Sequence, residues 1–400
     1  MRDLRDLRGL RGLRALVRRV DDATPPDRDR AVDALRALAI LGVVLGHWLV
    51  TAIVPDSGGL HVASPLRHLP WLAPISWVFQ TLAVFFLVGG HVAAKSHASA
   101  RARGTGYRAW LTVRLARLFR PVAAVLVLWT VAAGCMLASG AGLETVHTLV
   151  KLALSPLWFL LVFAALTAAT PLVARINPLW PLAVVLHVDL IRFGLGGPSW
   201  PGWINVAAGW LVPYTLGAAW TRGELTRRSG WVLLTGGAAA TAGLVLWAGY
   251  PASMVGVPGA TVSNLDPPTL AAVAFGLAQC GLALLVREPL GRWLRRPAAW
   301  AAVALVNLSA MTVFLWHQTA LMAVTALGLL AGSPLPGLHT VPDGLGWVPA
   351  RIAWLPVFAA GLAVCWAAFR TYEQGGRGSG RGGPRVVRVH RPAPKSVRRA

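Results

Sequence analysis

An apolar stretch near the start of the chain contains one residue that can bind an anion and one that can move a proton. Arg36 and His47 belong to the segment LRALAILGVVLGHWLV, residues 35–50. At about 100° per residue, eleven steps along a helix bring the two side chains within about 20° of one face and about 16 Å apart along the axis. Arginine suits anion binding, and imidazole titrates near neutral pH. The pair is therefore the first candidate for a site in this sequence.

Each member of the pair also has a purely structural interpretation. An arginine at the end of a membrane span fixes topology. A histidine inside a span can be a core group that hydrogen-bonds to a neighbouring helix. Ionisable side chains are costly in a bilayer, so function is the first hypothesis for His47. The spacing alone does not decide between these interpretations.

The composition indicates that these residues lie in membrane helices. Hydrophobic residues make up 56% of the 400 residues and charged residues only 13%, far from the balance of a soluble globular protein. Apolar runs of about twenty residues recur along the chain, long enough to cross a bilayer. We predict an all-α polytopic membrane protein with about ten transmembrane helices. The expected spans are 35–54, 72–94, 120–139, 155–173, 179–195, 201–220, 230–249, 269–286, 301–327 and 348–369.

The positive charge follows this topology. The formal net charge of +23 is a property of nucleic-acid binders too, but the arginines flank apolar segments and crowd both ends of the chain. We therefore expect no nucleic-acid partner, and we expect both termini on the cytoplasmic side. Three regions are predicted: a basic N-terminal arm over residues 1–30, a transmembrane domain over 31–373, and a disordered basic cytoplasmic tail over 374–400. The arm is either an amphipathic helix on the membrane surface or a solvated basic segment.

Six motifs occur in a fixed order along the chain. They are DRAVDALRALAILGVVLGHWL, LAVFFLVGGHVAAKS, RLARLFRP, SPLWFLLVF, FLWHQTALM and FRTYEQ. Together they resemble the membrane-bound acyltransferase-3 family of prokaryotic O-acyltransferases over roughly residues 29–373. The family's first span carries an arginine, ten residues and then a histidine, as Arg36 and His47 do. His91 is a departure, since the family usually has an aromatic residue there.

The resemblance implies a chemistry. Members transfer an acyl group, often acetyl, from cytoplasmic acyl-CoA to a hydroxyl of a sugar, a surface glycan of the cell envelope or a small metabolite. Acyl-CoA is then a co-substrate, no bound cofactor or metal is expected, and the partners are the donor, the acceptor and membrane lipids. His47 would be a general base or a covalent relay for the acyl group. Arg36 would hold the donor's phosphates or orient its thioester.

Other candidates follow from the same chemistry. Arg114 and Arg117 share a helix face and would bind the phosphates of the donor, unless they only fix topology. His91 would line the donor's path. His317 is either a second acid–base group or a core histidine beside Trp316, and Asn205 would contact the acceptor. His187 and Asp189, two residues apart, point in different directions and are not expected to form a dyad; Asp189 and Arg192 are expected to pair.

A secondary transporter is the competing interpretation. It would also have many spans with few polar groups, but ion-coupled transporters place carboxylates near mid-depth and show repeat symmetry. We find no internal repeat and no Asp or Glu well placed at mid-depth in this sequence. A membrane scaffold without activity is a third interpretation, which leaves the alignment of Arg36 with His47 without an explanation.

Overall fold

The computed structural model describes residue 12, residues 14–56 and residues 59–374, and the fold is helical as expected. The predicted tail from residue 375 and the arm before residue 12 lie outside the described residues. The longer helices are α2 (Arg30–Val50), α5 (Leu82–Ala102), α6 (Tyr107–Ala138), α7 (Leu143–Leu154), α8 (Leu157–Ala168), α10 (Leu179–Asp189), α11 (Ile204–Thr221), α12 (Arg227–Leu246), α13 (Leu270–Trp293), α14 (Pro297–Leu308), α15 (Ala310–Gly328) and α16 (Trp347–Gln374). Short helices α3 (Pro65–His68), α4 (Ala73–Ser76) and α9 (Thr170–Val173) connect them.

Eight helical stretches of the described chain are long and apolar enough to cross a membrane. They are Arg30–Val50, Pro70–Ala102, Tyr107–Ala138, Leu143–Ala168, Arg227–Leu246, Leu270–Trp293, Ala310–Ala331 and Trp347–Arg370. The chain is therefore a multi-pass membrane protein by helix composition.

Two of the ten expected spans, 179–195 and 201–220, are not among the eight stretches. The span predicted over 301–327 is among them but begins later, at Ala310, because the helix is interrupted at Ser309, which ends α14 and precedes α15. The span predicted over 179–195 contains α10, which has only 11 residues. Helix α11 has 18 residues and is not among the eight stretches.

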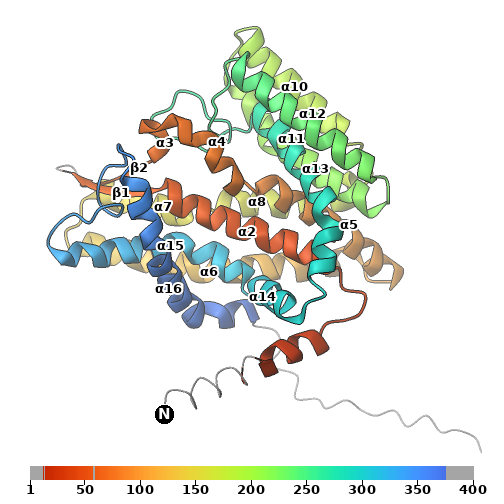
Figure 1. Cartoon of the computed structure of the whole chain (residues 1–400), viewed down its shortest axis with the longest axis horizontal. Coiled ribbons are helices and arrows are strands. Elements are labelled where there is room, and N and C mark those ends of the chain that lie inside the picture. The colour runs from red at the N-terminus through yellow and green to blue at the C-terminus, as the bar shows by residue number, and fades with distance from the viewer. Residues whose placement is uncertain (1–11, 13, 57–58, 375–400) are drawn as a thin grey trace, which may run out of the picture.

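Helix α2 runs through the middle of the molecule and carries both residues of the first candidate pair (Figure 1). It begins after Asp29, whose side chain accepts a hydrogen bond from the Val32 amide and so caps the first turn. It contacts α5, α13, α14, α15 and α16. Because the helix has no break between Arg36 and His47, the two residues keep the register predicted from the sequence, about 16 Å apart along the axis.

A two-stranded hairpin follows α2, in a region where the sequence predicted only the end of a span. Strand β1 (Ala52–Asp56) pairs antiparallel with β2 (Gly59–Ala63), in a register that sets Ala52 opposite Ala63. The hairpin lies beyond the C-terminal end of α2 (Figure 1). We call this end of the molecule the hairpin face and the opposite end, where α2 begins, the arginine face.

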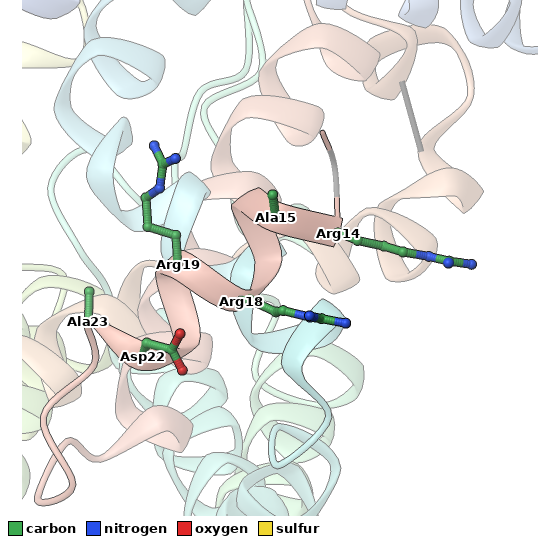
Figure 2. Close-up of a pocket in the computed structure, with 6 residues that line it drawn as sticks. All are labelled: Arg14, Ala15, Arg18, Arg19, Asp22 and Ala23. Atoms are coloured by element: carbon green, nitrogen blue, oxygen red, sulfur yellow. The ribbon is translucent and has the colours of Figure 1, made fainter. Parts of the chain in front are cut away.

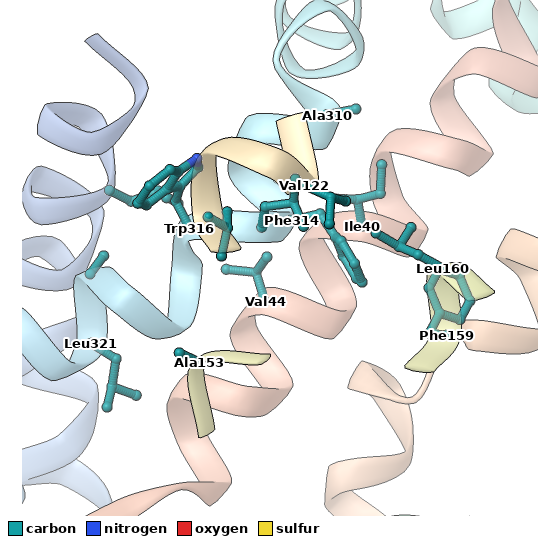
Figure 3. Close-up of a cluster of buried hydrophobic side chains, with 14 of the residues drawn as sticks. Ile40, Val44, Val122, Ala153, Phe159, Leu160, Ala310, Phe314, Trp316 and Leu321 are labelled. Carbon is teal, nitrogen blue, oxygen red and sulfur yellow. The ribbon is translucent and has the colours of Figure 1, made fainter. Parts of the chain in front are cut away.

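The core surrounds the central part of α2. Ile40 and Val44 of this helix lie among Phe159 of α8 and Phe314 of α15, as Figure 3 shows. A second close contact joins α5 to α11: a Cβ on Gly90 would lie 2.0 Å from the Tyr214 carbonyl oxygen. Only glycine permits this approach, which explains the need for the second glycine of FFLVGG.

The described part of the N-terminal arm is helical over residues 14–22 and packs on the arginine face. Asp21 accepts a hydrogen bond from Arg30 at 2.8 Å, and Thr24 accepts one from the Trp300 indole at 2.7 Å. Figure 2 shows Arg14 and Arg18 extending from one side of this segment and Arg19 from another. The open hollow beside them is lined by this segment alone, so it brings together no groups from different elements.

Candidate functional site

Two cavities lie at opposite ends of α2. The first, which we call the histidine cavity, has a volume of about 230 Å³ and is lined by His47, by residues of α7, α8 and α15, and by loops of the hairpin face. The second, the arginine cavity, has a volume of about 940 Å³ and opens at the arginine face beside Arg36. One uninterrupted helix therefore presents the histidine to one cavity and the arginine to the other.

His47 is held from α15. The Gln318 amide nitrogen lies 3.0 Å from His47 Nδ1, and the rings of His47 and His317 have their centroids 5.1 Å apart. The Trp48 indole donates to the His317 carbonyl at 3.0 Å, which joins α2 to α15 beside His47. Gln318 lines the histidine cavity with His47, whereas His317 does not appear among its lining residues.

His317 is a buried histidine whose ring nitrogens have unequal surroundings. Its Nδ1 lies 2.7 Å from the Phe314 carbonyl oxygen and must donate to it, so Nε2 carries the lone pair. Within the described chain, Nε2 has no hydrogen-bond partner. The structure thus places His317 next to His47 but behind it, as seen from the cavity.

Gln318 determines which nitrogen of His47 carries the proton. As placed, its amide N–H donates to Nδ1, and the neutral ring then has its proton on Nε2. With the amide turned over, Oε1 would accept from Nδ1–H and would leave a lone pair on Nε2, which is the tautomer that a general base needs. Gln318 Oε1 is buried and has no partner among the described residues. Sequence reasoning missed Gln318, although a glutamine inside an apolar span is itself a signal of function.

The arginine cavity is strongly basic. Its basic side chains are Arg28, Arg36, Lys95, Arg103, Arg114 and Arg117, and its carboxylates are those of Asp27, Asp29 and Asp33. Arg36 Nε donates to Asn307 Oδ1 at 2.6 Å, and its guanidinium lies 3.6 Å from Asp33. Asp33 also receives two hydrogen bonds from Arg28, at 2.5 and 2.8 Å. These contacts orient the basic groups at a site where anionic groups can bind.

The other donor-side candidates lie in this cavity. Arg114 donates to the Val92 carbonyl at 3.2 Å and lies over the Trp110 ring, while Arg117 lines the wall one turn further along α6. His91 lines the cavity as well: its Nδ1 is 3.0 Å from Thr221 Oγ1, and its ring stacks on Trp220. The structure therefore brings Arg36, Arg114, Arg117 and His91 together.

Asn205 lies elsewhere. It is fully buried, its amide donates to Asp189 at 3.0 Å, and it is not among the residues lining either cavity. Arg192 lies 3.6 Å from the same carboxylate, as expected of this pair. His187 instead contacts the Ala183 carbonyl, so no dyad with Asp189 forms.

A thin aromatic partition separates the two cavities. On α8, Phe163 lines the arginine cavity and Phe159 the histidine cavity; on α15, Met311 lines the first and Phe314 the second. Residues three or four apart on a helix are separated by about one turn, roughly 5 Å. The Phe159 ring centroid is 5.5 Å from that of Phe314 and 6.3 Å from that of Phe163. A chain that threads between these side chains would join the cavities.

Arg351 supports the hairpin-face end of α2 and was not predicted. It is 1% exposed, and its guanidinium donates to the carbonyls of Trp48, at 2.6 Å, and Gly337, at 3.0 Å, and to that of Thr51. Two of these acceptors, Trp48 and Thr51, lie one and four residues after His47, at the end of α2, where carbonyls lack intrahelical partners. Arg351 is therefore a structural anchor for the turn that carries His47.

The described residues contain no group of three or more His, Cys, Asp or Glu side chains that would hold a metal ion. Comparison with curated proteins and with solved structures finds no match. The model of one protein family, acyltransferase 3, described as an acyltransferase domain, matches residues 29–370. This range includes α2, the histidine cavity and all of the arginine cavity except Pro25, Asp27 and Arg28. The chain belongs to the acyltransferase-3 family of membrane-bound O-acyltransferases.

Proposed function

We propose that this acyltransferase moves an acyl group, typically acetyl, from acyl-CoA bound in the arginine cavity to a hydroxyl bound in the histidine cavity. The observation that carries the proposal is the division of α2 between the two cavities, with Arg36 at one and His47 at the other. A transfer between two substrates that enter from opposite ends needs this arrangement.

The arginine cavity fits the donor. Coenzyme A carries several phosphate charges, and the fork of a guanidinium matches phosphate oxygens. Arg36, Arg114 and Arg117 converge there from α2 and α6. The long, flexible pantetheine arm would extend along α2 and pass the partition of Phe159, Phe163 and Phe314 to bring its thioester to His47.

His47 would act on the acceptor. Its Nε2 would take the proton of the acceptor hydroxyl while the oxygen attacks the thioester carbonyl, and the C–S bond would then break to release the CoA thiol. This needs the Gln318 amide in the orientation that accepts from Nδ1–H. In the alternative mechanism, Nε2 itself would take the acyl group and pass it on to the hydroxyl. In both mechanisms Gln318 positions the ring.

The topology follows from charge. Arginines crowd the face where the donor would enter, and the positive-inside rule assigns that face to the cytoplasm. The protein would then lie in the plasma membrane with both termini cytoplasmic, and the acceptor, a sugar, surface glycan or small metabolite, would enter from the hairpin face. An ion-coupled transporter has no comparable support, because no Asp or Glu is among the described residues lining the histidine cavity.

The proposal can be tested in host cells that express the wild type, His47→Ala or His187→Ala at equal levels. His187 is a matched control, because it is a histidine of an apolar helix that lines neither cavity. Mass spectrometry of envelope glycans, lipids and secreted metabolites should show an acyl increment that disappears only with His47→Ala. Equal acylation in all three strains would contradict the role of His47, and a changed distribution of an unacylated metabolite would favour transport.

A further inference from the structure

The histidine cavity has an unusual lining for a site that would bind sugars. Most of its wall is apolar, and the aromatic side chains Phe79, Trp158, Phe159 and Phe314 contribute to it. Its polar side chains are hydroxyls, amides and the imidazole of His47. None of the described residues that line the histidine cavity is Asp, Glu, Lys or Arg. This contrasts with the arginine cavity, where nine charged side chains converge.

The lining restricts what can bind. A charged acceptor would lose its hydration in this cavity and find no opposite charge, which is unfavourable. An apolar or aromatic body would instead gain from leaving water. The basic residue Arg67 lies against Gly259, next to the loop that lines the cavity, but is not part of the lining. Its charge is therefore outside the space where the acceptor would lie.

We propose that the histidine cavity binds an uncharged hydroxyl compound with an apolar or aromatic body, rather than an acidic or fully polar sugar. This rests on the proposed function, because it assigns the cavity to the acceptor. Gln318 supplies a specific contact. When its amide is turned so that Oε1 accepts from His47 Nδ1–H, its NH2 group takes the position of the unpartnered Oε1, and a second hydroxyl beside the reacting one can accept a hydrogen bond from it.

The competing occupant of the cavity is a long acyl chain of the donor. The position of the cavity favours the acceptor, because residues of the hairpin face, including Val62 of β2 and Val255, line it on the side away from the arginine cavity. A donor that enters at Arg36 reaches the near side of His47 first. The far side is then left for the acceptor.

Three matched compounds test the proposal on the full chain in lipid nanodiscs: phenyl β-glucoside, methyl β-glucoside, which lacks the aromatic ring, and phenyl β-glucuronide, which adds a carboxylate. With acetyl-CoA as donor, kcat/KM for phenyl glucoside should exceed the other two values by about tenfold or more. Saturation-transfer NMR without donor should show the same ranking of binding. Equal or better use of the glucuronide or of methyl glucoside would overturn the proposal.

Two serine substitutions locate the effect. Ser155 lines the cavity and Ser139 does not, yet each hydroxyl donates at 2.8 Å to the carbonyl three residues earlier. Ser155→Asp should weaken binding of phenyl glucoside by about tenfold, and Ser139→Asp should leave it unchanged. An equal effect of both, or of neither, would contradict the assignment of this cavity.

The failure of the proposed function has a different signature. If CoA does not bind and no acceptor is acylated, the proposed reaction is wrong. The ranking of the three compounds by NMR, and the loss of binding in Ser155→Asp, still decide which class of compound the cavity binds. If octanoyl-CoA is the better donor and displaces phenyl glucoside from the cavity, the acyl chain occupies it and the proposal about the acceptor is wrong.

Discussion

Replacing Arg351 by methionine should both destabilise the protein and slow acyl transfer. The substitution keeps an apolar stem but removes the donor to the carbonyls of Trp48, Thr51 and Gly337. A buried acceptor left without a partner costs about 1–3 kcal/mol. Three such acceptors at the lower value give a loss of about 3 kcal/mol in the free energy of unfolding. The turn that carries His47 would loosen, so kcat should fall more than the affinity for the donor.

The matched control is Arg370→Met on the same helix. Arg370 is exposed and lies over the Trp366 ring, outside both cavities. Unfolding in mixed micelles, followed by circular dichroism, gives the stability, and acyl transfer from labelled acyl-CoA gives kcat. Equal free energies of unfolding for Arg351→Met and Arg370→Met would show that Arg351 does not stabilise the end of α2. If the Arg351→Met protein is destabilised but has the kcat of the wild type, Arg351 contributes to stability and not to acyl transfer.

Three further predictions concern the two cavities and the cap of α2. Gln318→Ala should lower kcat by about tenfold to a hundredfold, because the His47 ring loses the partner that sets its tautomer. The pH dependence of kcat should also shift, which a purely structural role of Gln318 would not cause. Arg114→Ala should raise KM for acyl-CoA by about tenfold with little change in kcat, whereas Arg108→Ala, outside the cavity, should do neither. Burial raises the pKa of Asp29, but the hydrogen bond from Arg287 and the capped backbone amide outweigh it, and the net pKa is lowered. The stabilisation of the folded state by the Asp29 carboxylate is therefore present above pH about 4 and is lost as the pH falls through the lowered pKa. Asp29→Asn keeps the cap of α2 but removes the charge. It should be less stable than the wild type at pH about 7, by roughly 1 kcal/mol at most, and equally stable in acid.

The alignment of Arg36 with His47 could be derived from sequence because it depends on helix periodicity alone. Helix α2 is unbroken between them, so eleven steps of about 100° determine the result. The basic clustering around Arg114 and Arg117 was likewise visible in the chain. The helical class followed from the apolar runs.

Other features depend on contacts between distant segments and leave little trace in local patterns. The partners of Gln318 and Arg351 lie on α2, hundreds of residues away in the chain. The first span, predicted to end near residue 54, ends at Val50, and the hairpin of Ala52–Asp56 with Gly59–Ala63 that follows it was not predicted. The break at Ser309 lacks the glycine or proline that marks most helix ends in a sequence.

We propose that His47 performs the transfer while the donor is held at the other end of α2. The most direct measurement compares purified wild type with His47→Ala for CoA binding and acyl transfer in the same preparation. We expect unchanged CoA binding in His47→Ala and a loss of transfer of about a hundredfold or more. Transfer at the wild-type rate, or loss of CoA binding together with transfer, would contradict the separation of roles between the two cavities.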